Sequence, residues 1–170
     1  FVMDLADPDT IVASSYQRRR HVWTLINGGP GGGVHKTTDG GKTWRKIKGG
    51  LPSGDLGRIG LAAAPSAPNI IYAIVEANDK DKGVYRSTDF GETWTSITGN
   101  LPAESINVIR EDPRHPNILY VGTDLGVYVS LDTGGTLHGL MSGLPTTPGH
   151  DLFVHPREGE LILGTHGRSV

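Results

Sequence analysis

A segment that occurs three times restricts the fold of this chain more strongly than any other feature of the sequence. The copies occupy residues 33–44, 83–94 and 126–137, and each begins with Gly-Val and carries an aspartate at the same position. A Leu-Pro pair follows each copy, at 51–52, 101–102 and 144–145. A repeat of this kind means that one structural unit is built several times and stacked on itself.

A second element is repeated between these copies. Residues 64–72 and 112–120 share the pattern Pro-x-x-Pro-Asn-Ile-[Ile/Leu]-Tyr, and residues 7–12 and 155–161 are looser copies. Asp39 and Asp89 are 50 residues apart, and Asp89 and Asp132 are 43 apart. Spacings of about 40 to 50 residues suit a four-stranded propeller blade.

The repeat can be divided into strands and turns. A strand at 106–110 ends at a Pro-bounded turn, because proline removes a ladder hydrogen bond. A second strand follows at 118–122, the Gly-Val-Tyr segment makes a third, and a fourth follows the aspartate turn, as at 93–97. We therefore expect an all-β fold of four-stranded antiparallel blades, with about three full blades and a partial fourth. Residues 1–170 would form one repeat domain with blades at 1–50, 51–100, 101–143 and 144–170.

Composition agrees with many short strands and excludes several other classes. The 170 residues include 25 Gly and 11 Pro, which indicates frequent turns. The formal net charge of −2 gives no general attraction for nucleic acid, and no apolar run approaches the roughly 18 to 20 residues of a membrane helix. Cysteine is absent, which excludes disulfides and thiolate metal sites but leaves the compartment open.

The first repeated segment contains the pattern S/T-x-D-x-G-x-T-W, which resembles the Asp-box (BNR) repeat of sialidases, sortilin-type receptors and xyloglucanase-like propellers. The first two copies match in full, with Thr37 in place of the usual serine, whereas the third has Leu137 in place of tryptophan. Residues 164–169 are also similar to the end of large bacterial glycosyl-hydrolase-like repeat proteins. The resemblance implies a β-propeller whose box lies away from any active site. It also implies an extracytoplasmic location, whether secreted, periplasmic or at the cell surface.

The residue types in the box point to a structural role. An aspartate can accept backbone amides and close the turn, glycine can adopt positive φ, and tryptophan would pack between sheets. We therefore predict structural roles for Asp39, Gly41, Trp44, Asp89, Gly91, Trp94, Asp132 and Gly134.

Three to four blades leave open how the ring is completed, because propellers usually have four to eight blades and an open arc exposes sheet edges. The chain could be a fragment of a longer parent, an arc completed by a second copy, or a small distorted ring. We favour the fragment, with the remaining blades supplied by the parent chain or by a second copy.

The densest polar and aromatic stretch interrupts the first repeat between its second and third strands, and we interpret it as an insertion loop. Its candidate ligand-binding residues are Tyr16, Arg18, Arg19, Arg20 and Trp23. Arginines bind carboxylates or phosphates in a bidentate manner, and the aromatic rings could stack on a sugar. The alternative is a solvated, charged loop. Sialidase chemistry needs arginines that converge from separate blades, so consecutive arginines argue against it.

Asp124 is the one candidate catalytic residue. It lies in a Thr-Asp-x-Gly-x-Tyr stretch that resembles the segment carrying a catalytic carboxylate in xyloglucanases. An inverting glycosidase needs a second carboxylate about 6.5 to 9.5 Å away, for which Asp4 and Asp151 are candidates. The alternative is that Asp124 is a turn residue between two strands.

Two other patterns carry no site. The Gly-rich segment 27–33 has the wrong spacing for a phosphate loop and leads into strands, without a helix N-terminus. His150, His155 and His166 lie close in sequence, but residues five apart on a strand face opposite sides. We expect no metal site and no cofactor.

These patterns leave two functional classes. The first is a binding or scaffold module that recognises a glycan or a protein partner through the face of the ring, without catalysis. The alternative is a glycoside hydrolase that acts on a polysaccharide with paired carboxylates.

Overall fold

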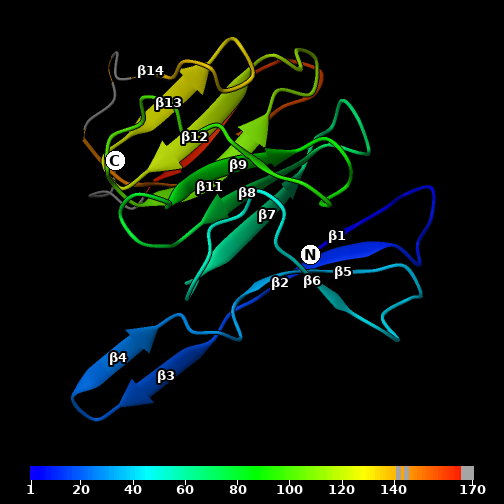
Figure 1. The fold of residues 1–170 in the computed structure, drawn as a ribbon. Helices are drawn as coiled ribbons and strands as arrows, with labels where there is room; N and C mark the ends of the chain where they lie inside the picture. The colour runs from blue at the N-terminus through cyan, green and yellow to red at the C-terminus, as the bar shows by residue number, and fades with distance from the viewer. Residues whose placement is uncertain (141–142, 144–145, 166–170) are drawn as a thin grey trace. The chain divides into compact units, whose positions relative to one another are not determined.

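The computed structural model describes residues 1–140, 143 and 146–165, in which the chain forms sixteen β-strands and no helix (Figure 1). The strands make three four-stranded antiparallel sheets and two two-stranded sheets. This confirms the all-β fold of propeller-type blades, with three complete blades and a partial fourth.

Each complete blade is a sheet of strands that are consecutive in the chain, apart from a hairpin inserted into the first. The first blade has the order β1 (Val2–Met3), β2 (Ile11–Ser15), β5 (Gly33–Thr37) and β6 (Arg45–Ile47). The second contains β7 (Ile59–Ala63), β8 (Ile71–Val75), β9 (Gly83–Ser87) and β10 (Thr95–Ser96). The third contains β11 (Ile106–Glu111), β12 (Leu119–Thr123), β13 (Val127–Ser130) and β14 (His138–Gly139). The partial fourth blade contains β15 (Gly149–Val154) and β16 (Leu161–Thr165).

The chain divides into two compact units. The first contains residues Phe1–Ala63 and Pro68–Ser96, and therefore the first two blades. The second contains Ala64–Ala67 and the described residues from Ile97 onward, and therefore the third blade and the partial fourth.

The core of the first unit lies between its two sheets. Strands β2 and β5 contribute Val12 and Val34, β8 contributes Ile71 and Val75, and all four side chains are buried in one apolar cluster. Trp94, the last residue of the second box, packs into the same cluster. Ile71 and Val75 are four residues apart on β8, so the alternation of side chains along the strand places both on the same face of the sheet.

The core of the second unit is smaller and joins the third blade to the partial fourth. Val108, Val127 and Leu152 form its buried centre. Close approach of β12 to β15 depends on Gly122, because a Cβ at that position would lie 2.6 Å from the carbonyl oxygen of Gly149. Glycine is thus required in the middle of a strand by the packing of two sheets.

The polar stretch that we interpreted as an insertion loop is instead a β-hairpin. Strands β3 (Arg18–His21) and β4 (Thr24–Asn27) pair in register, with Arg18 opposite Asn27 and His21 opposite Thr24. Its place between the second and third strands of the first blade is as predicted. Two residues link the strands, a length that fixes the register of a hairpin.

Candidate functional site

The two ends of each complete blade carry different kinds of side chain. The box turn joins the third strand to the fourth at one end, and the connection from the second strand to the third lies at the opposite end. The first residues after the second strands are Tyr16, Glu76 and Asp124. Within their own blades, Tyr16 and Asp124 therefore lie at the end opposite the box.

The first two boxes form the same hydrogen-bonded turn. In the first, Thr37 donates to Asp39 at 2.7 Å, and the Asp39 carboxylate accepts the Thr43 amide at 2.9 Å and its hydroxyl at 2.6 Å. In the second, Asp89 accepts the amide and hydroxyl of Thr93 at 2.9 and 2.6 Å. These aspartates are occupied by their own turns, which supports the structural role.

The same bonds set the acidity of the box carboxylates. Hydrogen bonds from Thr43 and Thr37 lower the pKa of Asp39 to about 2. Burial acts to raise the pKa of Asp89, but the bonds from Thr93 and Ser87 outweigh it and bring that pKa also to about 2. The amide of Thr136 is the main cause of the lowered pKa of Asp132. Carboxylates held ionised in this way are poor proton donors at neutral pH.

The box glycines have the positive φ that the sequence predicts, with values of 88°, 81° and 98° at Gly41, Gly91 and Gly134. The residue before each is left-handed as well, and in the second and third boxes it is not glycine: φ is 53° at Phe90 and 59° at Thr133. Nothing in the residue types of Phe90 and Thr133 predicts this second left-handed position, because a side chain disfavours positive φ.

The two box tryptophans differ in burial, which corrects the expectation that both pack between sheets. Trp94 is 4% exposed, whereas Trp44 is 44% exposed. The Trp94 amide donates to the carbonyl oxygen of Gly49, at the end of the preceding blade, at 2.9 Å. No blade precedes the first one among the described residues, where the Trp44 indole donates to the Gly41 carbonyl oxygen of its own turn at 3.0 Å.

Leu137 replaces tryptophan in the third box and is nonetheless buried. The Asn100 side chain forms hydrogen bonds with both backbone groups of Leu137. It donates to the Leu137 carbonyl oxygen at 2.9 Å and accepts the Leu137 amide at 2.8 Å. Hydrogen bonds from the Asn100 side chain to the backbone of Leu137 thus fix the position that tryptophan occupies in the other two boxes.

A buried cation joins the two blades of the first unit. The Lys36 ammonium group donates to the Phe90 carbonyl oxygen at 2.9 Å, lies 2.8 Å from the Glu92 carboxylate and is 5.3 Å from the centre of the Phe90 ring. Arg45 also pairs with Glu92. Arg45 and Lys36 together hold the pKa of Glu92 down at about 2. Because all these groups are satisfied by one another, they stabilise the blade junction.

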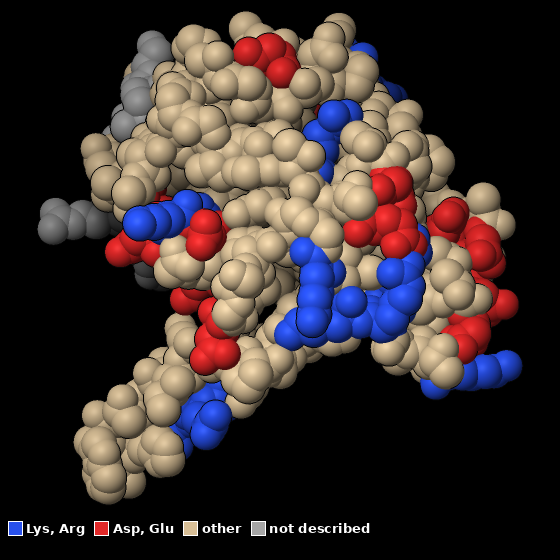
Figure 2. All heavy atoms as spheres, in the orientation of Figure 1, with Lys and Arg blue, Asp and Glu red and all other residues tan. Residues whose placement is uncertain are grey.

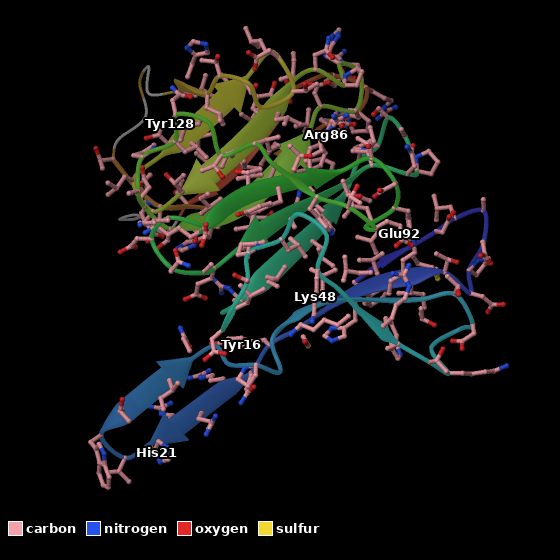
Figure 3. The ribbon with its side chains drawn as sticks, in the orientation of Figure 1. Tyr16, His21, Lys48, Arg86, Glu92 and Tyr128 are labelled. Carbon is pink, nitrogen blue, oxygen red and sulfur yellow. The ribbon has the colours of Figure 1, made fainter. Side chains whose placement is uncertain are left out.

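The β3–β4 hairpin is anchored at its base by polar side chains. The Tyr16 hydroxyl donates to the Asn27 side-chain oxygen, and the Asn27 amide group donates to Glu76 at 3.4 Å. The other oxygen of Glu76 accepts the Arg58 amide at 2.9 Å. Figure 3 shows Tyr16 at the base of the hairpin and His21 toward its far end.

The Gly-rich segment beside the hairpin is bound by neighbouring side chains. Lys46 donates to the carbonyl oxygens of Pro30 and Gly32 at 2.9 and 2.6 Å, and Gln17 accepts the Gly31 amide at 2.7 Å. The carbonyl oxygens of this segment accept hydrogen bonds from Lys46, and these contacts stabilise the segment.

All eight strand residues of the hairpin are exposed to solvent, and so are the two residues of its turn. Val22 is 97% and Trp23 is 85% exposed. Within the part of the chain that the structure describes, no ion pair involves Arg18, Arg19 or Arg20. Figure 2 shows basic side chains on the hairpin behind an uncharged tip. The candidate ligand-binding residues therefore lie together on one projecting element.

Asp124 lies in a hydrogen-bonded turn of the third blade. It accepts the Asn107 side-chain amide at 3.0 Å, and its own amide donates to the Ser105 carbonyl oxygen at 3.1 Å. Glu104 reaches the same turn, where it accepts the Leu125 amide at 2.9 Å and the Tyr128 hydroxyl at 3.2 Å. Burial, together with the nearby charge of Glu104 and the bond to it, raises the pKa of Tyr128.

Asp4 and Asp151, the two candidates for the second catalytic carboxylate, form hydrogen bonds with other groups. Asp4 accepts the Ala6 amide at 2.8 Å, within a local turn. Asp151 accepts Arg110 at 3.1 Å and the Leu152 amide at 2.9 Å.

The histidines of the C-terminal region do not form a cluster in the described residues. His155 accepts the Glu158 amide through Nδ1 at 3.2 Å, and His166 lies outside the described residues. Over residues 1–140, 143 and 146–165, no group of three or more His, Asp or Glu side chains is arranged to hold a metal ion. The same residues include no helix with the length and apolar character needed to cross a membrane.

Sequence reasoning missed Glu76 and Glu104. Glu76 holds the same repeat position as Tyr16 and Asp124, directly after the second strand, so an alignment of the three blades would have found it. Glu104 lies in the connection between two blades, where no repeated pattern marks it.

Comparison with known proteins agrees with the blade architecture. No family model matches the sequence, and no curated protein matches it significantly. A GH74 xyloglucanase from Xanthomonas campestris matches with a TM-score of 0.68 at 19% identity, over 96% of this chain and 26% of that one. A GH74 enzyme from Niastella koreensis matches with a TM-score of 0.62 at 16% identity, over 96% and 25%. The protein YCF48, solved bound to a D1 peptide, matches with a TM-score of 0.53 at 18% identity, over 96% and 54%.

These matches define the class of protein. The solved structures are β-propellers, and the chain shares their fold. It spans about a quarter of the length of the two GH74 enzymes and about half of YCF48. At such low identity the similarity extends to the fold alone.

Proposed function

We propose that this chain is a binding and scaffold module of a β-propeller, which recognises a glycan or a protein partner through the face of the ring that carries the β3–β4 hairpin. The observation that carries the proposal is the hairpin itself, whose three arginines are exposed and have no acidic partner among the described residues. Functional residues on a projecting element of a rigid scaffold are a common arrangement.

The proposed binding residues differ in their expected roles. Arg18, Arg19 and Arg20 would bind carboxylates or other anionic groups, because a guanidinium group donates two parallel hydrogen bonds to such groups. Tyr16 and Trp23 would supply aromatic surface, Tyr16 at the base of the hairpin and Trp23 at its tip. Tyr16 is already oriented by Asn27, which favours a fixed contact at the base.

Retention on immobilised polysaccharides, and on immobilised partner proteins from a candidate panel, tests this proposal. We expect retention of the chain without release of reducing ends, and a loss of at least about tenfold in affinity for Trp23→Ala. Trp44→Ala is the matched control, because Trp44 is also exposed but lies at the opposite end of the first blade. Equal loss in both variants would refute the assignment of the ligand to the hairpin end.

The alternative function is a glycoside hydrolase, and one observation favours it. Two carboxylates, Asp124 and Glu104, bond to the same turn of the third blade. A hydrolase of this kind would use one as general acid and the other as general base or nucleophile. Release of reducing ends from a β-glucan, lost in both Asp124→Ala and Glu104→Gln, would establish this alternative in place of simple binding.

Further blades are part of the proposal. The exposed face of Trp44 would receive another blade, supplied by a longer parent chain or by a second copy. The equivalent position at Trp94 is covered by the Gly49 and Gly50 segment of the preceding blade, which supports this assignment. An extracytoplasmic location, as the Asp-box resemblance implies, also belongs to the proposal.

A further inference from the structure

The β3–β4 hairpin has an edge on each side that no strand covers. Its sheet contains two strands, and within the described residues neither β3 nor β4 pairs with a third. Alternate residues of an antiparallel strand direct their N–H and C=O groups toward the outer edge. A two-stranded hairpin whose side chains are all exposed is marginally stable in water, and a third strand stabilises it.

The charge on β3 faces both sides of the hairpin. Consecutive side chains of a strand point to opposite faces, so Arg19 lies on the face opposite to Arg18 and Arg20. The cross-strand neighbours agree, because Arg18 is opposite Asn27, Arg19 is opposite Ile26 and Arg20 is opposite Leu25. A flat polymer lying on one face would reach only part of this charge.

A strand added beside β3 would reach the charge of all three arginines. Its own side chains alternate between the two faces, so consecutive acidic residues would meet the three consecutive arginines on the faces to which each points. Its backbone would at the same time pair with the free N–H and C=O groups of β3. Charge complementarity and the open edge therefore require the same kind of partner.

We propose that the outer edge of β3 binds an extended acidic peptide segment as a third strand, with carboxylates at consecutive positions paired to Arg18, Arg19 and Arg20. This inference rests on the proposed function and narrows it from a glycan or a protein to a protein partner with an acidic, extended segment.

Three labelled probes test the inference by fluorescence anisotropy on the 170-residue chain at low salt. The first is an acetylated and amidated hexaglutamate, and the second is the same peptide N-methylated at every residue, which keeps its charge but cannot donate strand hydrogen bonds. The third is a hexameric oligogalacturonate, which has the same number of carboxylates and no peptide backbone. Hydrogen–deuterium exchange of residues 18–21 reports strand addition directly.

We expect the unmodified peptide to bind at least about tenfold more tightly than either of the other two probes, and to protect amides of β3. The triple variant Arg18→Gln, Arg19→Gln and Arg20→Gln should lose at least about tenfold in affinity for the peptide. The control variant Lys42→Gln, Lys48→Gln and Lys80→Gln removes the same charge from exposed positions outside the hairpin and should bind normally.

Other outcomes would overturn the inference and separate it from the broader proposal. Equal binding of the N-methylated peptide would mean that charge alone is recognised. Tighter binding of oligogalacturonate would assign the hairpin to an anionic glycan and leave the proposed function standing. Binding to vesicles of phosphatidylglycerol, lost in Trp23→Ala, with no peptide binding, would assign it to a membrane surface. Retention on a neutral polysaccharide without binding of any anionic probe would refute the inference alone.

Discussion

Gly50 lies where the first blade meets the Trp94 of the second, and replacing it with alanine should weaken this junction. Its φ is 76°, in the left-handed region, and an added Cβ would lie 1.8 Å from the Trp94 carbonyl oxygen. A methyl carbon cannot lie this close to a carbonyl oxygen. The backbone of one blade must therefore move away from the other. The neighbouring bond from the Trp94 amide to Gly49, 2.9 Å long, would be strained or lost.

The size of the effect can be estimated from these contacts. The left-handed conformation costs an alanine about 1–2 kcal/mol. Loss of the backbone hydrogen bond adds about 0.5–1.5 kcal/mol, and partial exposure of Trp94 adds a comparable amount. We therefore expect Gly50→Ala to lower the free energy of unfolding by about 2–5 kcal/mol. At roughly 2–4 °C per kcal/mol for a chain of this size, the midpoint of thermal unfolding falls by roughly 4–20 °C.

Gly54→Ala is the matched control. Gly54 also has a positive φ, of 97°, but nothing lies within 4 Å of its added Cβ. This variant should show only the conformational cost, about 1–2 kcal/mol. Urea and thermal unfolding, followed by tryptophan fluorescence, measure both variants. If Gly50→Ala destabilises the chain no more than Gly54→Ala does, the assignment of Gly50 to a close blade contact is wrong.

Three further predictions follow from the same structure. Trp94→Ala should destabilise the chain by about 3–5 kcal/mol, as expected for a buried tryptophan, and Trp44→Ala by roughly 1 kcal/mol, so equal losses in urea unfolding would contradict the difference in burial. The pKa values of Asp39 and Asp89 are about 2 in the folded chain and near 3.8 when unfolded, so the stability they contribute is present above pH 4 and is lost as the pH falls toward 2. An acid titration of the unfolding midpoint should show this loss, and substitution of both residues by asparagine should reduce it. Lys36→Met should cost about 1–3 kcal/mol, because the backbone carbonyl and carboxylate that it binds lose a buried donor, and an unchanged midpoint would refute that role.

Much of the architecture was predictable from the sequence because repetition amplifies weak local signals. A single Gly-Val segment could be a strand in many folds, but three copies at blade spacing, each followed by a similar turn, specify four-stranded units. The turn contacts of Asp39 and Asp89 were predictable for a related reason. Their bonds to Thr43 and Thr93 close within four residues, so local chemistry decides them.

The candidate site was predictable in its residues but not in its form. The arginines and the aromatic residues from Tyr16 to Trp23 were evident as a cluster, yet they were taken for a loop. Their strand pairing depends on the residues from Thr24 to Asn27, whose polar and apolar side chains do not alternate and so do not indicate a strand. Glu76 and Glu104 were missed because each contributes through contacts with residues that are distant in sequence.

What the sequence by itself determined is therefore the unit of the fold: the blade, its turns and the residues that close them. Tertiary structure decided how much of each repeated residue is buried. Trp44 and Trp94 occupy identical positions in identical turns, but Trp94 has a preceding blade to pack on and Trp44 has none among the described residues. Burial is a property of two surfaces in contact, and a sequence repeat specifies only one of them.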